Sequence, residues 1–394
     1  MERLIKLSQR KTDTVKTDFK RFLFTEIDWR QPLTVIIGHR GAGKTTLLLQ
    51  RIKELKGNAI YLSLDDIYFE TYRLVELIDT LYEKGYRHFF LDEVHRYQHW
   101  SKDLKNIYDN YPKITIVTTG SSILEVNKGQ ADLSRRAVTY HLPGLSFREF
   151  LELEYQQTFP KITLDTITQF HQEISSGYTD LVDIDKTFKE YMQYGYYPFF
   201  KEGIKVYGQK LQDTTNLVLD IDIAPFEDLS HATVRNMKKL LYIISQSVPF
   251  TPNITKISER MNVPRNSILK ILDLLNHARI ISLLKRDTKG ISYLQKPKKI
   301  YLQNPNLAWL LSENKPDIGN LRETFFFSQT EVSHRVTSSR FSDFTIDDVY
   351  TFEIGGPSKT DEQIKGIPNS YIASDGIKGG AGKKIPLWLF GFLY

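Results

Sequence analysis

Two short runs in the first hundred residues carry side chains suited to holding a triphosphate. The first, residues 38–45, reads GHRGAGKT and fits G-x-x-x-x-G-K-[ST], the pattern of a phosphate-binding loop. Glycines let successive backbone N–H groups face one anion, and the helix that begins near Lys44 adds the positive end of its dipole. We therefore expect the phosphates to contact Gly38, His39, Arg40, Gly41, Ala42, Gly43, Lys44, Thr45 and Thr46.

Lys44 and Thr45 have separate predicted roles in this loop. The Lys44 ammonium would reach the β- and γ-phosphates and act in catalysis, and the Thr45 hydroxyl would be a ligand of Mg²⁺. The preceding apolar run, residues 33–37, predicts a buried parallel strand. Strand, loop and helix thus follow in the order that the motif requires.

The second run, residues 89–93, reads FFLDE and predicts a strand that ends in two carboxylates. Acids at this end of a parallel strand would lie beside the phosphate loop, where open parallel sheets bind ligands. Asp92 would hold Mg²⁺ directly or through water, and Glu93 would orient and polarise the attacking water. The alternative is a protein that binds nucleotide without hydrolysing it.

Further candidates follow a third strand, expected at residues 114–117 between the strands of the other two motifs. It runs into a stretch with four hydroxyl side chains at 118–122, which could contact the γ-phosphate or the water. Ser121 could contact the γ-phosphate or the water, although a serine here could equally cap the next helix. Arg135, or Arg136 beside it, could neutralise charge on the transferred phosphoryl group, from its own subunit or from a neighbour. His95 and His99 have a spacing that could bind a metal, but no third ligand is visible and we expect no metal there.

The elements that must position these residues alternate between strand and helix. Helical spacing of apolar residues covers 47–55 and 74–81, and a strand pattern covers 59–62 between them. A final strand is expected at 137–142. Such alternation predicts an α/β fold with a parallel sheet and helices on both faces. Residues 4–24 predict a partly helical arm that packs on this domain.

Composition limits the possible chemistry and the environment. The chain contains no cysteine, which excludes disulfides, thiolate zinc sites and cysteine nucleophiles. The N-terminus has no signal-peptide pattern, and the longest apolar run, residues 385–394, is too short to span a bilayer, so we expect a cytoplasmic protein with no membrane partner. The net charge is +6, yet residues 255–302 alone carry +8.

This basic segment has the pattern of a winged helix. Short helices are expected around Ile254–Met261 and after Pro264, followed by a basic hairpin at 280–302. The second helix would enter a major groove of duplex DNA and the hairpin would follow the phosphates. The expected contacts are Arg265, Lys270, Lys298 and Lys299. The alternative is a winged helix that packs against protein.

The last ninety residues predict a mixed α+β domain. Three of its acids are placed as in a restriction-endonuclease-like metal site. Glu323 lies on an expected helix, and Asp343 and Glu353 lie on or beside expected strands. Gly355 stands where a restriction-endonuclease-like Glu-x-Lys motif would have its lysine, although Lys359 could reach in. We expect loops over 355–384, a final strand at 387–393, and little nuclease activity.

Several of these motifs together resemble a known family. The chain is similar to the AAA-type ATPases of the bacterial and archaeal group that also carries a winged helix and a poorly understood C-terminal domain. The matching stretches are Gly38–Thr45, Phe89–Glu93, Thr119–Ser122, Arg135, Leu142–Leu151 and Tyr194–Pro198. The resemblance implies an additional-strand P-loop fold, binding of ATP with Mg²⁺, and slow hydrolysis. The chain departs from conventional AAA proteins because it lacks a recognisable second sensor arginine.

The sequence therefore predicts a parallel-sheet P-loop core with a helical lid, a winged helix and an α+β C-terminal domain. The predicted function is Mg-dependent ATP hydrolysis coupled to binding of DNA or a protein, with nucleotide state altering the lid and the winged helix. A nucleotide-gated signalling or scaffold protein and an ATP-gated nuclease are the alternatives. The expected boundaries are 1–26 for the arm, 27–145, 146–250, 251–304 and 305–394.

Overall fold

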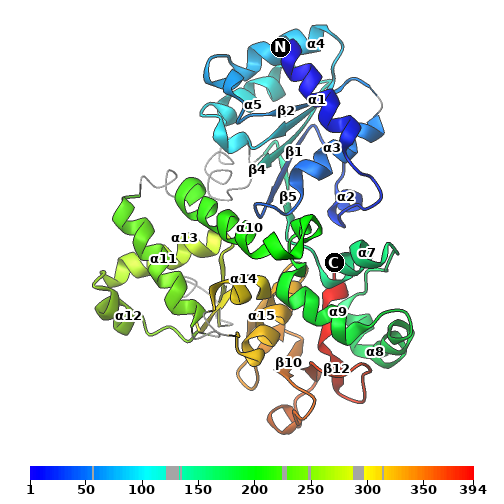
Figure 1. Ribbon diagram of the computed structural model, residues 1–394, viewed down its shortest axis with the longest axis vertical. Helices are drawn as coiled ribbons and strands as arrows, with labels where there is room; N and C mark the ends of the chain where they lie inside the picture. The colour runs from blue at the N-terminus through cyan, green and yellow to red at the C-terminus, as the bar shows by residue number, and fades with distance from the viewer. Residues whose placement is uncertain are drawn as a thin grey trace. The chain divides into compact units, whose positions relative to one another are not determined.

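The computed structural model describes residues 1–394 except 56, 121–132, 134, 224–228, 247–249, 287–296 and 313–314 (Figure 1). The chain divides into two units, and each is described by itself. The first contains Met1–Gly144 and Asp220–Leu229, and the second contains Leu145–Leu219 and Ser230–Tyr394. The finer division expected from the sequence stays a prediction. None of the described helices is both long and apolar enough to cross a bilayer.

The first unit is built on a five-stranded sheet in the order β2-β3-β4-β1-β5, and every pair of neighbours is parallel. Strand β4 therefore lies between β1, which leads into the phosphate loop, and β3, which ends in the acid pair. The sequence analysis places the third strand there. The strands are β1 (Leu33–Gly38), β2 (Ala59–Ser63), β3 (His88–Asp92), β4 (Thr115–Gly120) and β5 (Val138–Leu142).

Helices cover both faces of this sheet because successive strand residues point to opposite sides. In β3, Phe89 and Leu91 join a core with α4 and α5, whereas Phe90 joins a core with α3 on the other face. The N-terminal arm packs on the sheet as expected: Leu4 is buried, and Ser8 Oγ accepts the Tyr61 N–H at 2.9 Å. The helices are α1 (Glu2–Thr14), α2 (Leu23–Glu26), α3 (Lys44–Leu55), α4 (Leu74–Glu83) and α5 (Trp100–Asn110).

The second unit begins with the helices expected between residues 147 and 250. Ser146 caps α7 in a reciprocal pair with Glu149, so the run LSFREF encodes a helix start. Two π-helical segments, η3 (Tyr191–Gly195) and η5 (Val218–Ile223), follow other helices, and the last four residues of η5 belong to the first unit. The helices are α7 (Phe147–Tyr155), α8 (Leu164–Thr179), α9 (Ile184–Glu190), α10 (Ile204–Leu217) and α11 (His231–Ser245).

Two helices and a two-stranded antiparallel sheet lie where the winged helix is predicted. They are α12 (Ile254–Met261), α13 (Arg265–His277), β6 (Ile281–Leu284) and β7 (Lys299–Leu302). Asn262 ends α12 in the left-handed conformation, with φ of 52°, which makes the expected turn before Pro264. The tip of the expected hairpin lies outside the described residues. The winged-helix assignment stays a prediction.

The C-terminal region is a mixed sheet in the order β12-β11-β10-β9-β8, packed with α15. The expectation of loops over 355–384 and a strand at 387–393 is wrong. Strand β11 lies inside that segment and β12 begins at its last residue. The apolar run forms the 3-10 helix η8, because a short run buried on all sides fits a helix as well as a strand. The elements are α14 (Pro305–Leu311), α15 (Ile318–Thr330), β8 (Val336–Ser338), β9 (Phe344–Ile346), β10 (Tyr350–Gly355), β11 (Ser370–Ser374), β12 (Lys384–Pro386) and η8 (Leu387–Phe392).

Candidate functional site

The phosphate loop connects the end of β1 to the first turn of α3. Gly41 and Gly43 have φ of 82° and 94°, a conformation that favours glycine. Gly38 has a different reason to be glycine, since a Cβ there would lie 2.1 Å from the Leu142 carbonyl oxygen of β5. The loop residues are therefore set by backbone conformation and by close contact between strands.

Lys44 is folded over the loop that carries it. Its ammonium donates to the carbonyl oxygens of Gly38 at 3.0 Å and His39 at 2.8 Å, and the side chain is buried. Burial lowers the pKa of Lys44, and the carboxylates of Glu93 and Asp92 oppose that shift. A phosphate beside this ammonium would favour its charged form further.

Asp92, at the end of β3, receives hydroxyl donors from three other elements. Thr45 Oγ1 of α3 donates to Asp92 Oδ2 at 2.6 Å, and Tyr61 OH of β2 donates to the same oxygen at 2.7 Å. Thr119 Oγ1 of β4 donates to Oδ1. The structure thus brings the two predicted metal ligands, Thr45 and Asp92, into direct contact.

Tyr61 was not singled out from the sequence, and Thr119 was noted only as one of several hydroxyls at the end of its strand. Thr119 lies in the third motif, where Ser121 was the expected contact, and Ser121 lies outside the described residues. Tyr61 belongs to an ordinary strand pattern, and only the pairing of Ser63 with Asp92 shows that β2 lies beside the site. Burial, followed by the Asp92 charge, raises the pKa of Tyr61, so its hydroxyl stays protonated and donates.

Glu93 faces a different environment from Asp92. Its φ of 53° is left-handed, and its N–H donates to Thr119 Oγ1 at 3.2 Å. Its side chain remains 20% exposed, whereas Asp92 is only 2% exposed. A partly accessible carboxylate next to a buried one is what a water-orienting group beside a metal ligand requires.

A carboxylate from a distant part of the sequence completes this region. Asp222, in the four residues of η5 that belong to the first unit, is 2% exposed. Arg96 Nη2 donates to Asp222 Oδ1 at 3.1 Å, and Arg40 Nε lies 3.5 Å from Oδ2. Arg40 Nη2 also lies 3.8 Å from Glu93 Oε2. No sequence signal pointed to Asp222, because its distance along the chain hides its place in the fold.

His95 lies between the two carboxylates as a neutral imidazole. Its Nε2 is 3.5 Å from Glu93 Oε2 and 3.9 Å from Asp222 Oδ1. Burial, together with Arg96, Lys44 and Arg40, lowers the pKa of His95 to about 3. Among the described residues, no group of three or more possible metal ligands includes His95 or His99.

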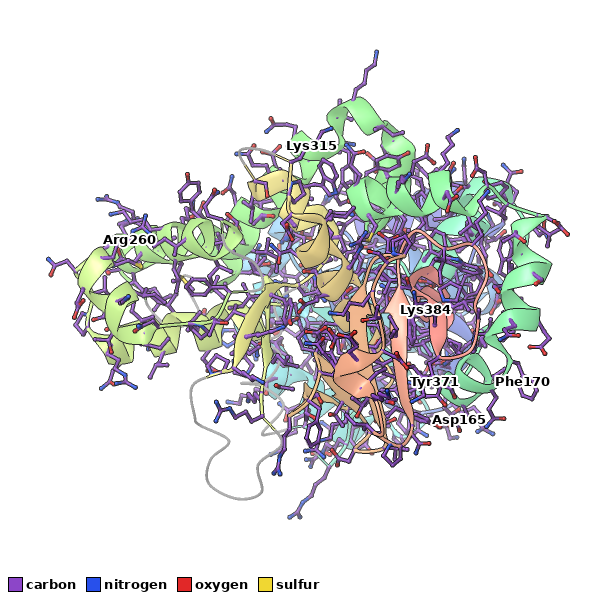
Figure 2. The ribbon with its side chains drawn as sticks, turned by 90° about the horizontal axis from the view of Figure 1, so that it is seen from below. Asp165, Phe170, Arg260, Lys315, Tyr371 and Lys384 are labelled. Carbon is purple, nitrogen blue, oxygen red and sulfur yellow. The ribbon has the colours of Figure 1, made fainter. Side chains whose placement is uncertain are left out.

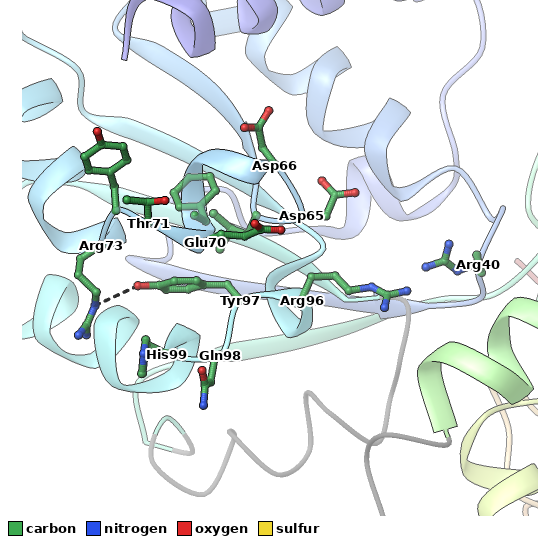
Figure 3. A pocket seen from close by; sticks show the side chains of 13 residues that line it. Arg40, Asp65, Asp66, Glu70, Thr71, Arg73, Arg96, Tyr97, Gln98 and His99 are labelled. Atoms are coloured by element: carbon green, nitrogen blue, oxygen red, sulfur yellow. Dashed lines mark hydrogen bonds between the residues drawn. The ribbon is translucent and has the colours of Figure 1, made fainter. Parts of the chain in front are cut away.

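A cavity of about 750 Å³ opens beside this cluster. Figure 3 shows Arg40 and Arg96 at one end, with the Arg96 guanidinium group directed toward Arg40. Tyr97, His99 and Asp65 line other parts of its wall. Arg40 and Arg96 therefore border both the phosphate loop region and an accessible space.

Arg135 does not join the site within this chain. Strand β5 runs parallel to β1 with Thr34 opposite Val138 and Gly38 opposite Leu142. Residues just before Val138 therefore lie at the edge of the sheet where strands begin, whereas the phosphate loop lies where they end. Arg136 pairs with Asp109, with Nε 3.0 Å from Oδ1. The role of Arg135 in catalysis stays a prediction.

The acids of the C-terminal region already have cationic partners. Lys299 Nζ lies 2.8 Å from Glu323 Oε2 and 3.1 Å from Asp343 Oδ1. Lys359 Nζ lies 2.5 Å from Glu353 Oε1, and its stem crosses Gly355, where a Cβ would lie 2.7 Å from it. Lys359 thus extends past Gly355 to Glu353, which is the approach that the sequence suggested.

Lys299 occupies the place that a cation would take between Glu323 and Asp343. Burial favours the neutral form of its amine, but the two carboxylates outweigh it and raise the pKa of Lys299. No group of metal-binding side chains is found here among the described residues. Lys299, which the sequence predicts as a DNA contact, is thus paired with two carboxylates, and its contact with DNA stays a prediction. Lys298 Nζ likewise donates to the Ser339 carbonyl oxygen at 3.3 Å.

Comparisons with known proteins agree with this geometry. Residues 30–151, which contain the phosphate loop, Asp92 and Glu93, match the family model described as AAA domain. This part of the chain is therefore an AAA-type ATPase-like domain, a class that binds nucleotides. Comparison with curated proteins gave no significant match.

Two solved structures returned by the comparison have low identity to this chain and TM-scores below 0.5. A Walker-type ATPase of Pyrococcus abyssi is 14% identical, with a TM-score of 0.40, over 78% of this chain and 95% of its own. The RuvB Holliday junction branch migration motor of Thermotoga maritima is 16% identical, with a TM-score of 0.32, over 74% of this chain and 90% of its own. The chain has the α/β fold of a P-loop NTPase, extended by an α+β region.

Proposed function

We propose that the protein is a Mg-dependent ATPase. The contact between Thr45 and Asp92 carries this proposal, because it joins the phosphate loop to the end of β3 through a hydroxyl and a carboxylate. Both are hard oxygen ligands of the kind that Mg²⁺ prefers. When bound, Mg²⁺ would neutralise charge on the phosphate oxygens during transfer. The Thr45 hydroxyl and the Asp92 carboxylate are therefore suitable ligands for that ion.

The other residues of the site would either bind the phosphates or activate the attacking water. The loop N–H groups and Lys44 would hold the phosphates, and the partly exposed Glu93 would orient the attacking water. Arg135 of a neighbouring chain would stabilise the developing charge. In this account the buried Asp92 is held rigidly by three hydroxyl donors, so that the ion would meet a fixed oxygen.

The test is nucleotide binding and phosphate release by the full chain with and without magnesium. The wild-type protein should bind ATP and release phosphate only when Mg²⁺ is present. Lys44→Ala should lose roughly a hundredfold or more in turnover, because it removes a preorganised charge. Lys53→Ala, on the exposed end of α3, is the matched control and should behave as wild type. A wild-type chain that releases no phosphate in any condition would contradict the proposal.

We propose duplex DNA as a partner of the basic region, on a narrower surface than the sequence suggested. Arg265 and Lys270 lie on exposed positions of α13, and Figure 2 shows Arg260 of α12 projecting away from the ribbon. Lys298 and Lys299, the other two predicted contacts, bond to groups within the second unit, so the proposed surface is centred on α13. Arg265→Gln should weaken DNA binding and reduce its salt dependence by about 0.9 in the logarithmic slope. Unchanged binding would favour a signalling or scaffold role without DNA.

A further inference from the structure

Asp222 is a buried carboxylate whose partners belong to the nucleotide site. It lies in a four-residue segment, Asp220–Ile223, which the contacts of the fold assign to the first unit although the neighbouring residues of η5 belong to the second. Its side chain is 1% exposed and is held by Arg96 and Arg40. A carboxylate this deeply buried is stable only because cations pair with it.

The two arginines lie beside the phosphate loop and Glu93. Arg40 is the third residue of the phosphate loop, and its guanidinium group lies 3.8 Å from Glu93, the group expected to orient water at the γ-phosphate. Arg96 ends the 3-10 turn η2 (Val94–Arg96) that follows Glu93 directly. Figure 3 shows both side chains at the same end of the cavity. Two guanidinium groups that converge in this way require an anion between them.

The charges in this region show that Asp222 and a phosphate would compete. Three basic side chains, Lys44, Arg40 and Arg96, lie here with three acidic ones, Asp92, Glu93 and Asp222. Burial raises the pKa of Asp222, and Arg40 and Arg96 oppose that shift by favouring its charged form. A triphosphate adds negative charge beside Asp222, which repels it. Phosphate oxygens also bind guanidinium groups through paired hydrogen bonds at least as well as a carboxylate does.

We propose that Asp222 occupies the place of the terminal phosphate when no nucleoside triphosphate is bound. When a triphosphate binds, Arg40 and Arg96 release Asp222 and bind the terminal phosphate instead. The proposal rests on the proposed function, since it assigns residues within the same site. It makes Arg96 a phosphate-binding residue and makes the Arg40–Arg96 pair a discriminator between triphosphate and diphosphate. A diphosphate lacks the γ-phosphate, so it leaves the pair with Asp222.

The first test compares the affinity of the full chain for two nucleotides, ATPγS and ADP, both with Mg²⁺, by isothermal titration calorimetry. Asp222→Asn removes the competing charge and should tighten ATPγS binding by roughly tenfold while changing ADP binding by less than about twofold. Arg96→Gln should abolish the preference for ATPγS over ADP. Asp220→Asn is the control, because it makes the same charge change at an exposed position of the same segment.

The outcomes separate this inference from the proposed function. If the wild-type chain binds ATPγS but Asp222→Asn leaves that affinity unchanged or weaker, only the role of Asp222 is wrong. If the wild-type chain binds neither nucleotide, the proposed function fails and this inference fails with it.

A second measurement needs no variant, and so it holds even if Asp222→Asn does not fold. Hydrogen exchange at the backbone amides of Asp220–Ile223 should speed up when ATPγS binds, because the side chain that anchors the segment has lost its partners. ADP should leave the exchange unchanged. Equal or greater protection with ATPγS would overturn the proposal.

Discussion

Thr45 Oγ1 donates a hydrogen bond of 2.6 Å to Asp92 Oδ2, which joins the start of α3 to the end of β3. Residues 47 positions apart in the sequence thereby form one polar site at the edge of the sheet where parallel strands end. The same oxygen also accepts from Tyr61, so this carboxylate is oriented before any ligand arrives. The predictions below test what this arrangement does.

Removing the Thr45 hydroxyl should damage turnover much more than stability. Thr45→Val keeps the size of the side chain but deletes the oxygen that faces Asp92, so phosphate release should fall by roughly a hundredfold. Steady-state ATPase assays at varied Mg²⁺ concentration would measure this. Thr80→Val is the control, because the Thr80 hydroxyl donates to the Glu76 carbonyl oxygen of its own helix. Normal turnover in Thr45→Val would rule out the assigned role of this hydroxyl.

Tyr61 should contribute to stability through its bond to Asp92. Tyr61→Phe leaves the ring in place but removes one donor from a buried carboxylate, which should cost about 2 kcal/mol of the free energy of unfolding. Urea denaturation followed by circular dichroism would measure the loss. Tyr72→Phe, at a residue that is 53% exposed, should change little. Equal stability of the two variants would show that the hydroxyl of Tyr61 is not needed by Asp92.

His95 should make the protein less stable on mild acidification. Its pKa of about 3 in the folded chain lies below its ordinary value of 6.5, so between these values the unfolded chain binds a proton that the folded chain does not. The free energy of unfolding should therefore fall as pH is lowered from about 7.5 to about 5.

The contribution of His95 can be isolated by substitution. The slope of the unfolding free energy against pH reports how many more protons the unfolded chain binds than the folded chain. His95→Asn should lower that number by up to about one, whereas the exposed His231→Asn should leave it unchanged. His88, whose pKa is also lowered by burial, keeps part of the slope in both variants. An unchanged slope in His95→Asn would mean that this imidazole accepts a proton in the folded state.

Lys299 should hold the C-terminal region together. Lys299→Met leaves Glu323 and Asp343 without their shared cation in a mostly buried place, which should cost about 3 kcal/mol. Thermal and urea unfolding would measure it. Lys378→Met is the control, because Lys378 forms a surface pair with Asp185 and such pairs contribute little. If Lys299→Met is as stable as Lys378→Met and weakens DNA binding, Lys299 contacts DNA, as the sequence predicts, and does not stabilise the C-terminal region.

The core of the site could be predicted because its signals are local. The glycine loop, the strand that ends in Asp92 and the helix after Lys44 each occupy one short stretch, and the order of motifs implied that β4 lies between β1 and β3. Helix starts such as Ser146 were also encoded locally, as a serine followed three residues later by Glu149.

The rest depended on contacts between distant residues. Asp222 reaches the site from far along the chain, Lys299 is held by acids from two later elements, and the edge of the sheet at which Arg135 lies follows only from the pairing of β5 with β1. Strands β11 and β12 were missed because short strands beside glycine-rich segments carry little periodicity of their own.

The most direct test of the central claim is a single comparison of wild type with Glu93→Gln, in which ATP binding is measured by calorimetry and turnover by phosphate release. The account predicts that the variant binds Mg-ATP about as tightly as the wild type and releases no phosphate, because the loop and Asp92 remain while the water-orienting carboxylate is gone. A Glu93→Gln variant that hydrolyses ATP at the wild-type rate would contradict it, as would a wild-type chain that binds no ATP.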